Sequence, residues 1–430
     1  TGPDGRSDRS SDAADGATSP DSDLPEAADG IVRGVLDLDR SYLAVQGPPG
    51  TGKTYTASHV IARLVNEHGY RIGVVAQSHA IVENLLERVV EAGVPAAQVA
   101  KAPKDPRGAE PGYTVIRKDG LAAYLAEHGP GASAPGCVVG GTAWDFSSTR
   151  RVQRGELDLL VIDEAGQFSL ASTIAVAAAA RNLLLLGDPQ QLPQVSQARH
   201  PAPVQQAALD WLSDGHDTLP PELGYFLDTT YRMRPELAAV SSHLSYDDRL
   251  DANPCTAKRT LEGIEPGLHT VLVEHDRNRT TSIEEARTVL RLVVGAVGRS
   301  WVTEEGDRPL DPADVLVVAP YNAQVNLIRG LLDDAGLEGV RVGTVDKFQG
   351  QEAVVVIISM ASSSASSGRG AAFVLSRNRL NVALSRAQHT AFLVHSPQLT
   401  DLIPATPHAL AQLGAFLGTS RSGRPGFDRS

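Results

Sequence analysis

The chain has 430 residues, which is enough for two or three domains with sizeable cores. Its formal net charge is −12 and it has no basic tail, so composition alone gives no sign of a nucleic-acid partner. The two cysteines, Cys137 and Cys255, lie far apart and outside any Cys-x-x-Cys spacing, which argues against a disulfide framework and a zinc site. There is no signal peptide and no apolar run of membrane-spanning length, so we expect a soluble, cytoplasmic protein.

The first segment, residues 1–30, is rich in Pro, Gly and Ser and contains eight acidic and two basic residues. It has little apolar surface to bury, which predicts a disordered acidic linker. The sequence does not begin with Met. We therefore expect this chain to be a piece of a longer protein.

Short apolar runs then alternate with helical patterns. Runs rich in Val, Ile and Leu that are separated by helices indicate parallel sheets covered on both faces. Two sets of runs predict two α/β domains, at 31–235 and 236–410, with a loop-rich insertion at about 95–136 and a partly disordered tail at 411–430. The predicted strands are YLAV, RIGVVAQ, CVVGG, LDLLVID and NLLLLGD in the first domain, and TVLVEHD, DVLVVAP, VRVGTV, AVVVIISM and TAFLVHS in the second.

The segment GPPGTGKT, residues 47–54, fits the phosphate-binding pattern G-x-x-x-x-G-K-[ST] and lies between a predicted strand and a predicted helix. Glycines allow successive backbone N–H groups to turn onto phosphates, and the helix N-terminus adds positive potential. Lys53 would reach the β- and γ-phosphates and Thr54 would hold Mg²⁺. The alternative is a Gly-rich turn that caps a helix without a ligand. The predicted nucleotide-binding residues here are Gly47, Pro48, Pro49, Gly50, Thr51, Gly52, Lys53 and Thr54.

Two acidic residues, Asp163 and Glu164, follow the predicted strand LLVI. The carboxyl ends of parallel strands are where such sheets bind ligands. Asp163 is suited to Mg²⁺, and Glu164 can act as a general base on water. The alternative reading makes both of them surface charges. Gln191, in the turn GDPQQLP after the next strand, could contact the γ-phosphate, although alone this segment is equally a Pro- and Gly-containing turn.

Eight sequence blocks follow one another along the chain: GPPGTGKT, AQSHAIVENLL, VIDEAGQ, LLGDPQQLPQV, LDTTYRMRPEL, VVAPYNAQVNLI, VGTVDKFQGQE and RLNVALSRAQ. Their order resembles that of superfamily 1 helicases, specifically the Upf-like branch of superfamily 1B. They run from about Gly47 to Ala387. The amino-acid sequence of several blocks is also similar to the C-terminal helicase region of bacterial proteins that begin with a RecB-like nuclease. The resemblance implies two RecA-like P-loop domains with parallel sheets, an ATP site in the cleft between them, and a nuclease domain elsewhere in the same polypeptide.

The resemblance also implies roles for single residues in the ATP site. Arg232 and Arg386 match the two arginine fingers, whose planar guanidinium groups suit the charge on transferring phosphoryl oxygens. Tyr231 should stack on adenine, and Gly350 and Glu352 in FQGQE should line the nucleotide, with Glu352 at the ribose. Without the resemblance, Arg386 would be read as a helix-surface arginine.

The remaining blocks match those that hold the backbone of a nucleic-acid strand. Hydroxyls and helix N-termini contact phosphates without reading sequence, and an aromatic side chain near the path could stack on bases. His79 taken alone would be read as a turn residue. The implied strand-binding residues are Ser78, His79, Gly141, Thr142, Pro320, Tyr321, Thr344, Asp346 and Gln349.

Together these features predict a helicase or translocase that hydrolyses ATP with Mg²⁺ and moves 5′ to 3′ along a single strand. The bacterial resemblance favours DNA, and RNA stays open because both use the same backbone contacts. One alternative is an ATP-regulated clamp that holds nucleic acid or a nuclease without unwinding. Another is a P-loop ATPase of a different class. Three features depart from the family pattern: the segment before the P-loop lacks an adenine-reading Gln, it has no room for a β-barrel insertion, and Gln194 replaces a Pro.

Overall fold

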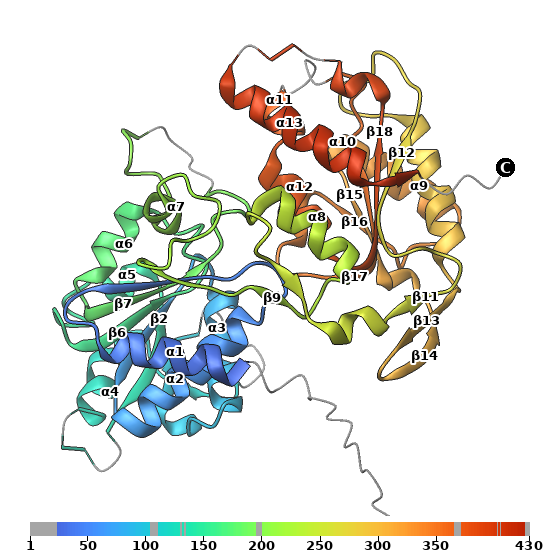
Figure 1. Ribbon diagram of the computed structural model, residues 1–430. Helices are drawn as coiled ribbons and strands as arrows, with labels where there is room; N and C mark the ends of the chain where they lie inside the picture. Colours follow the sequence, from blue (N-terminus) through green and yellow to red (C-terminus); the bar gives the residue numbers. More distant parts are fainter. Residues whose placement is uncertain are drawn as a thin grey trace, which may run out of the picture.

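The fold is described by a computed structural model for residues 24–103, 111–129, 131–132, 135–194, 200–364, 371–401, 403–404 and 406–425. Two lobes lie side by side, one blue to green and the other yellow to red (Figure 1). Each lobe is a parallel sheet with helices on both faces, which confirms the predicted architecture of two RecA-like α/β domains. No helix in the described ranges combines the length and the apolar character needed to cross a membrane.

The sheet of the first lobe has eight strands in the order β4-β3-β5-β2-β6-β7-β1-β8, and every pair is parallel. The five strands predicted in this half are confirmed, and their inner positions are buried. The bounds are β1 (Tyr42–Gln46), β2 (Arg71–Val75), β3 (Val99–Lys101), β4 (Thr114–Val115), β5 (Cys137–Gly141), β6 (Leu157–Ile162), β7 (Ala180–Gly187) and β8 (Gly224–Phe226).

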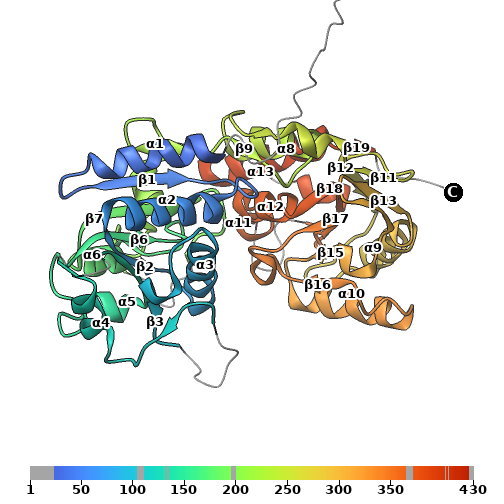
Figure 2. The same ribbon diagram turned by 90° about the horizontal axis from the view of Figure 1, so that it is seen from below.

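Helices cover both faces of this sheet. Figure 2 shows α1 and α2 on one side and α4 and α5 on the other. Separate apolar clusters fill the two interfaces, one around Ile61 and Leu86 and the other around Leu125 and Phe146. The bounds are α1 (Leu24–Leu36), α2 (Lys53–His68), α3 (His79–Glu91), α4 (Leu121–Glu127), α5 (Ala143–Phe146), α6 (Leu170–Ala177) and α7 (Ala208–Ser213).

The sheet of the second lobe has six parallel strands in the order β16-β15-β17-β18-β12-β19. The five predicted runs again form strands. The bounds are β12 (Gly267–Leu272), β15 (Val315–Val318), β16 (Arg341–Gly343), β17 (Ala353–Ser359), β18 (Ala387–His395) and β19 (Arg424–Pro425).

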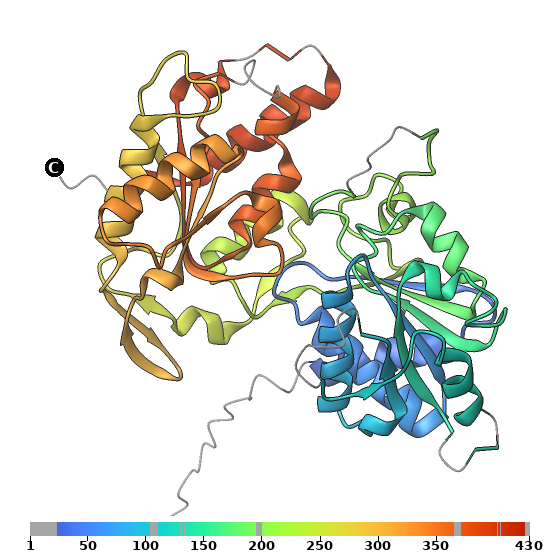
Figure 3. The ribbon, with the colours of Figure 1, turned by 180° about the vertical axis from the view of Figure 1, so that it is seen from behind.

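The helices of the second lobe also pack against its sheet through two apolar clusters. One cluster contains residues of α8, α12 and α13, and the other contains residues of α9 and α10. Figure 3 shows α10, in orange, in front of the strands. The bounds are α8 (Pro235–Ser245), α9 (Ile283–Ala296), α10 (Asn322–Asp334), α11 (Ala371–Val374), α12 (Arg377–Leu384) and α13 (Pro407–Ser422).

Three regions differ from the sequence prediction. Helix α1 begins at Leu24 within the expected linker, of which residues 1–23 lie outside the described residues. The expected insertion contributes β3, which hydrogen-bonds to β5 and therefore belongs to the sheet. The expected C-terminal tail is helical up to Ser422 because Leu413 and Phe416 are buried in the second core; its last five residues, 426–430, lie outside the described residues.

Two small sheets have no counterpart in the prediction. Their strands are two to four residues long, too short to stand out as apolar runs. One pairs β9 with β10 in parallel and the other is antiparallel, in the order β11-β13-β14. The bounds are β9 (Thr229–Thr230), β10 (Asp251–Ala252), β11 (Thr260–Leu261), β13 (Ser300–Thr303) and β14 (Gly306–Pro309).

A buried polar network joins the lobes. Asp188, which follows β7, accepts a hydrogen bond of 2.7 Å from the Tyr246 hydroxyl, which follows α8. The Asn381 amide on α12 donates to the Tyr246 oxygen (2.9 Å) and to the carbonyl of Gln190 (3.1 Å). Burial and the nearby Asp188 raise the pKa of Tyr246. The phenol therefore stays protonated and keeps its donor directed at Asp188.

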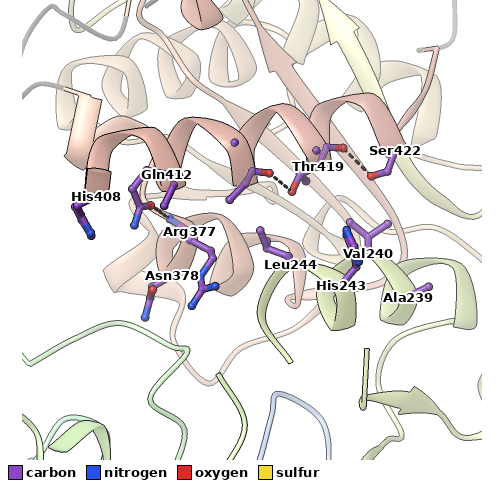
Figure 4. A pocket seen from close by; sticks show the side chains of 14 residues that line it. Ala239, Val240, His243, Leu244, Arg377, Asn378, His408, Gln412, Thr419 and Ser422 are labelled. Carbon is purple, nitrogen blue, oxygen red and sulfur yellow. Dashed lines mark hydrogen bonds between the residues drawn. The ribbon is translucent and has the colours of Figure 1, made fainter. Parts of the chain in front are cut away.

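The amino end of α12 adds further contacts with the first lobe. Arg377 pairs with Asp217, with one contact at 2.7 Å, and donates to the Gln190 side chain (2.9 Å). The neighbouring Asn378 donates to the carbonyl of Gln191 (2.7 Å). Figure 4 shows Arg377 and Asn378 at one end of a groove of about 670 Å³ between α8 and α13. Helix α12 thus contacts the loop that follows β7 along its first turns.

Two glycine substitutions test the packing of these layers. A Cβ at Gly73, in the centre of the first sheet, would lie 2.7 to 2.8 Å from Leu157, Leu160 and Phe146. We expect Gly73→Ala to lower the free energy of unfolding by about 1–3 kcal/mol. Gly330, in the interior of α10, has no such neighbour within 4 Å. There the same substitution should raise stability by about 0.5–1 kcal/mol. Thermal unfolding measures the change in stability of each variant. A change of the same sign and size in both variants would contradict the packing described here for Gly73.

Candidate nucleotide and strand-binding sites

A cleft of about 490 Å³ lies between the lobes, and it brings together most of the predicted nucleotide residues. All eight P-loop residues line it, together with Glu164 and Gln191 of the first lobe and Gly350, Glu352 and Arg386 of the second. Tyr231 and Arg232, which follow β9, line it as well. Asp163 is buried behind this surface. The prediction missed Tyr55, Asn84, Arg88, Arg259 and Gln388, which also line the cleft.

The P-loop has left-handed backbone at Gly50 (φ 80°) and Gly52 (φ 72°), which favours glycine at both positions. A Cβ at Gly50 would also lie 2.5 Å from the Cβ of Arg232. Residues of the segment after β8 also hold the loop in place. The Thr230 hydroxyl donates to the carbonyl of Pro49 (3.0 Å), and the Tyr231 N–H donates to the carbonyl of Gly50 (2.9 Å). The P-loop and the segment that carries Arg232 therefore form one continuous surface.

Lys53, the first residue of α2, forms an ion pair with Glu164 at 3.1 Å. Burial alone would lower the pKa of Lys53, but Glu164, Asp163 and Asp188 outweigh it and raise the pKa. Glu164 itself has left-handed backbone (φ 56°), which is uncommon for a residue with a side chain. Its N–H donates to the Asp163 carboxylate at 2.9 Å. The lysine is thus held charged above two adjacent carboxylates.

Two of the carboxyl groups that act on Lys53, those of Asp163 and Asp188, are buried. Burial raises the pKa of Asp163 to about 6, with the Lys53 charge opposing the shift. Burial also raises the pKa of Asp188, against hydrogen bonds from Tyr246, Gln190 and Gln191. The Gln191 amide donates to Asp188 at 3.1 Å. Gln191 therefore connects the cleft directly to the buried network between the lobes.

Arg232 and Glu352 form an ion pair of 2.7 Å across the lobes. Arg232 also donates to the carbonyl of Ser385 (3.1 Å), and Glu352 accepts from Gln388 (2.9 Å). Burial would raise the pKa of Glu352, but the Arg232 charge and its hydrogen bond outweigh it and lower the pKa. Arg259, which the sequence did not point to, donates to the carbonyl of Arg232 at 2.7 Å.

Arg386 is only 2% exposed. Its guanidinium donates to the carbonyls of Val382 (3.0 Å) and Gln351 (3.2 Å) and to the Ser385 hydroxyl (3.4 Å). Within the described residues, no carboxylate lies within 4.0 Å of it. Burial, together with the Arg232 charge, lowers its pKa to about 9, so it is charged at neutral pH. A buried cation without a carboxylate partner strongly favours an anion beside it.

The strand-binding residues predicted in the first lobe lie at the carboxyl edge of its sheet. Val75 of β2 pairs with Gly141 of β5 and with Ile162 of β6, so these strands end on one level. The Ser78 hydroxyl caps α3 by accepting from the Ile81 N–H. His79 lies 2.9 Å from the ammonium of Lys101, a buried residue at the end of β3 that the prediction missed.

Thr142, the residue after β5, is used within its own turn. Its N–H and its hydroxyl both donate to the Asp145 carboxylate at 2.7 Å, and this capping box starts α5. These two donors are therefore engaged inside the protein in this arrangement, whereas the hydroxyl oxygen still has acceptor capacity.

The predicted residues of the second lobe follow β15 and β16, whose ends Val318 and Gly343 pair with each other. Pro320 lies at this edge, but the Tyr321 ring is 8% exposed and packs 5.7 Å from Phe373, so it contributes to the core. Asp346 pairs with Arg379 at 3.1 Å. This supplies a cation at the edge that the prediction did not single out. Thr344 and Gln349 bracket the short helix Val345–Phe348 at the same edge.

Two family models, each described as an AAA domain, match residues 28–212 and 210–398. DNA replication ATP-dependent helicase/nuclease JHS1 of Arabidopsis thaliana is 26% identical over a match that covers 85% of this chain and 28% of that protein. DNA replication ATP-dependent helicase/nuclease DNA2 of Gallus gallus is 25% identical over a match that covers 83% of this chain and 35% of that protein. The regulator of nonsense transcripts 1 homolog of Drosophila melanogaster is 24% identical over a match that covers 84% of this chain and 34% of that protein. The chain spans about a third of the length of these relatives.

Among solved structures, the complex of arterivirus nonstructural protein 10 (helicase) with DNA matches 86% of this chain and 62% of that chain, at 15% identity and a TM-score of 0.45. The two adjoining AAA-domain matches agree with the two parallel sheets and with the order of the motifs along them. Both lobes of the chain therefore match AAA domains, and the chain is similar to ATP-dependent helicases, as the order of its motifs predicts.

Proposed function

We propose that this chain is an ATP-dependent helicase or translocase that moves along single-stranded nucleic acid in the 5′ to 3′ direction. The observation that carries the proposal is the composition of the cleft. Lys53, Glu164 and Gln191 from one lobe meet Arg386 from the other around a single cavity. Hydrolysis at such a site depends on how the lobes are placed, which is the requirement for converting ATP turnover into movement. The division between the two functional domains is proposed at about residue 235.

In the proposed ATP complex, the P-loop N–H groups and Lys53 bind the β- and γ-phosphates. Lys53 now pairs with Glu164 at 3.1 Å. A triphosphate carries more negative charge than one carboxylate and would replace Glu164 as the partner of Lys53. Glu164 would then be available as the general base for the attacking water. Tyr231 would stack on the adenine and Gly350 would line the nucleotide.

The two arginines would stabilise the transferring phosphoryl group. Arg386 is buried without a carboxylate partner among the described residues, so phosphate oxygens would supply the missing countercharge. Arg232 would leave Glu352 for the γ-phosphate, which frees the Glu352 carboxylate for the ribose hydroxyls. Gln191, held by Asp188, would place its amide beside the same phosphate.

Mg²⁺ fits this site because a buried carboxylate and a P-loop hydroxyl are available to it. Thr54 lines the cleft, and Asp163 is 3% exposed at the end of β6. Thr54 and Asp163 would hold the ion, which neutralises charge on the β- and γ-phosphates when bound.

The strand is proposed to cross the carboxyl edges of both sheets, from Ser78, His79, Gly141 and Thr142 in the first lobe to Pro320, Thr344, Asp346 and Gln349 in the second. We favour DNA because several relatives are named DNA replication helicase/nucleases. The relatives named regulators of nonsense transcripts keep RNA as the second candidate. A nuclease domain elsewhere in the same polypeptide is proposed on the same basis. An ATP-regulated clamp is the alternative to a motor.

The first prediction for the cleft separates ATP binding from ATP hydrolysis. Lys53→Ala should abolish ATP binding, because it removes the phosphate-binding cation, and with it strand-stimulated ATPase. Glu164→Gln should keep ATP binding and lower turnover by about 10²–10⁴-fold, since it removes the general base. Binding of a fluorescent ATP analogue and steady-state ATPase measure the two effects. Intact stimulated turnover in Lys53→Ala would refute the proposed site.

The second prediction concerns Arg386. Arg386→Ala should reduce the turnover number by about 10³–10⁵-fold with little change in ATP affinity, because a finger acts on transition-state charge. Arg329 is a matched control: its guanidinium also donates to backbone carbonyls, those of Glu338, Val340 and Val342, but it lies on α10 away from the cleft. Arg329→Ala should leave turnover unchanged. Equal losses in both variants would indicate a structural role for Arg386.

The third prediction identifies the polymer and the mode of action. ATPase should be stimulated by one kind of single strand, DNA before RNA and not by blunt duplex, and stimulation should fall with salt as phosphate contacts are screened. Displacement of a labelled strand in the presence of ATP shows movement. Stimulated turnover without displacement would support the clamp, and unstimulated turnover with every polymer would refute a nucleic-acid motor.

A further inference from the structure

Trp144 on α5 is unusually exposed for a tryptophan. It is 82% exposed, against 47% for Trp211 and 3% for Trp301, the other two tryptophans of the chain. Its own packing therefore contributes little to the stability of the first lobe. A large apolar ring held in solvent is a candidate contact for a ligand with a flat apolar face.

The backbone around Trp144 is fixed on both sides. Asp145 accepts two hydrogen bonds from Thr142 and pairs with Arg151, and Phe146 is 1% exposed within the core of the lobe. A Cβ at Gly141 would lie 2.9 Å from the Phe146 ring, so that ring packs directly under the end of β5. Because its neighbours are anchored, Trp144 presents its ring from a rigid turn. A ligand that contacts it does not have to order the backbone first.

The sheet register places Trp144 at the edge proposed to hold the strand. Gly141, three residues before it, pairs with Val75, three residues before Ser78. Val75 in turn pairs with Ile162, two residues before Glu164. Neighbouring strands lie about 4.8 Å apart, so the ends of β5 and β6 are separated by about 10 Å. Trp144 thus follows a strand that ends two places from the proposed hydrolytic carboxylate.

Basic residues follow Trp144 closely in the chain. Arg150, six residues after Trp144, is exposed, whereas Arg151 is used in the ion pair with Asp145. Arg154 does not belong to this edge, because it lines a pocket with Arg40 and Arg181 at the amino ends of the strands. Aromatic rings combined with nearby cations are what single-strand binding proteins use, since the ring stacks on a base and the cations offset the phosphate charge. An aromatic ring followed by an exposed cation therefore favours an unpaired nucleotide, rather than an apolar protein segment, as the ligand that contacts Trp144.

We propose that Trp144 is a base-stacking residue that binds one unpaired base of the strand. The proposal rests on the proposed function and adds a contact to the base, whereas the residues inferred from the motifs contact only the backbone. Stacking accepts every base, so Trp144 would raise affinity without selecting a sequence. Duplex would not use it, because paired bases are already stacked on one another.

The test uses the full chain and a fluorescein-labelled oligodeoxythymidine of 20 nucleotides. Trp144→Ala should weaken binding by about 5-fold to 150-fold, which corresponds to the roughly 1–3 kcal/mol of one stacked base. Trp144→Phe should recover most of the affinity because it keeps an aromatic face. Trp211→Ala is the control, since it removes a second exposed tryptophan from α7, and binding should be unchanged. Quenching of tryptophan fluorescence by the unlabelled strand should be lost in Trp144→Ala only.

The outcomes distinguish the two proposals. If the unsubstituted chain shows strand-stimulated ATPase and Trp144→Ala binds the strand equally well, the stacking proposal is wrong and the proposed function stands. If the unsubstituted chain does not bind any strand, both fail. If sedimentation shows a dimer that Trp144→Ala converts to a monomer while strand affinity is unchanged, Trp144 is a protein contact, which also overturns the stacking proposal.

Discussion

The buried carboxylate of Asp188 is the interaction on which the arrangement of the two lobes depends. It is 2% exposed and accepts hydrogen bonds from Gln46 (3.3 Å), Gln191 (3.1 Å) and Tyr246 (2.7 Å) and from the Gln190 N–H (3.0 Å). Burying a carboxylate costs free energy unless such donors are in place. The four donors are therefore held in fixed positions around the same group. They come from both lobes. The position of Gln191 in the cleft and the position of α12, which carries Arg386 just beyond its end, are therefore fixed by the same group.

Three of the five cationic residues that line the cleft, Lys53, Arg232 and Arg386, differ in how their charge is neutralised. Lys53 and Arg232 each have a carboxylate partner within the protein, whereas Arg386 has backbone carbonyls and a hydroxyl. A ligand that binds Lys53 or Arg232 must compete with Glu164 or Glu352. A ligand that binds Arg386 relieves an unbalanced charge. This difference favours a polyanion such as a triphosphate, which can offset the loss of two ion pairs by contacts with all three cations.

Ten of the fourteen strands in the two large sheets were predicted, because continuous apolar runs reflect burial on both faces. The P-loop was predicted because four positions of that motif are fixed. The short strands of the β11-β13-β14 sheet were missed since two to four residues carry no periodic signal. Lys101 and Arg259 were missed for a different reason. Their side-chain partners, His79 and Glu83 for Lys101, and the carbonyl of Arg232 for Arg259 lie 18 or more residues away in sequence. Helix α13 was taken for a tail because its Gly and Ser residues mask Leu413 and Phe416.

The contact between α12 and the loop after β7 also has a mechanical consequence. Asn378 and Asn381 donate to the carbonyls of Gln191 and Gln190, so a rotation of one lobe against the other that kept these bonds would have its pivot near them. Displacement grows with distance from a pivot. In the first sheet, β5 lies three places from β7, or about 14 Å. Such a rotation would therefore move the end of β5, where Thr142 and Trp144 lie, further than it moves the residues of the cleft.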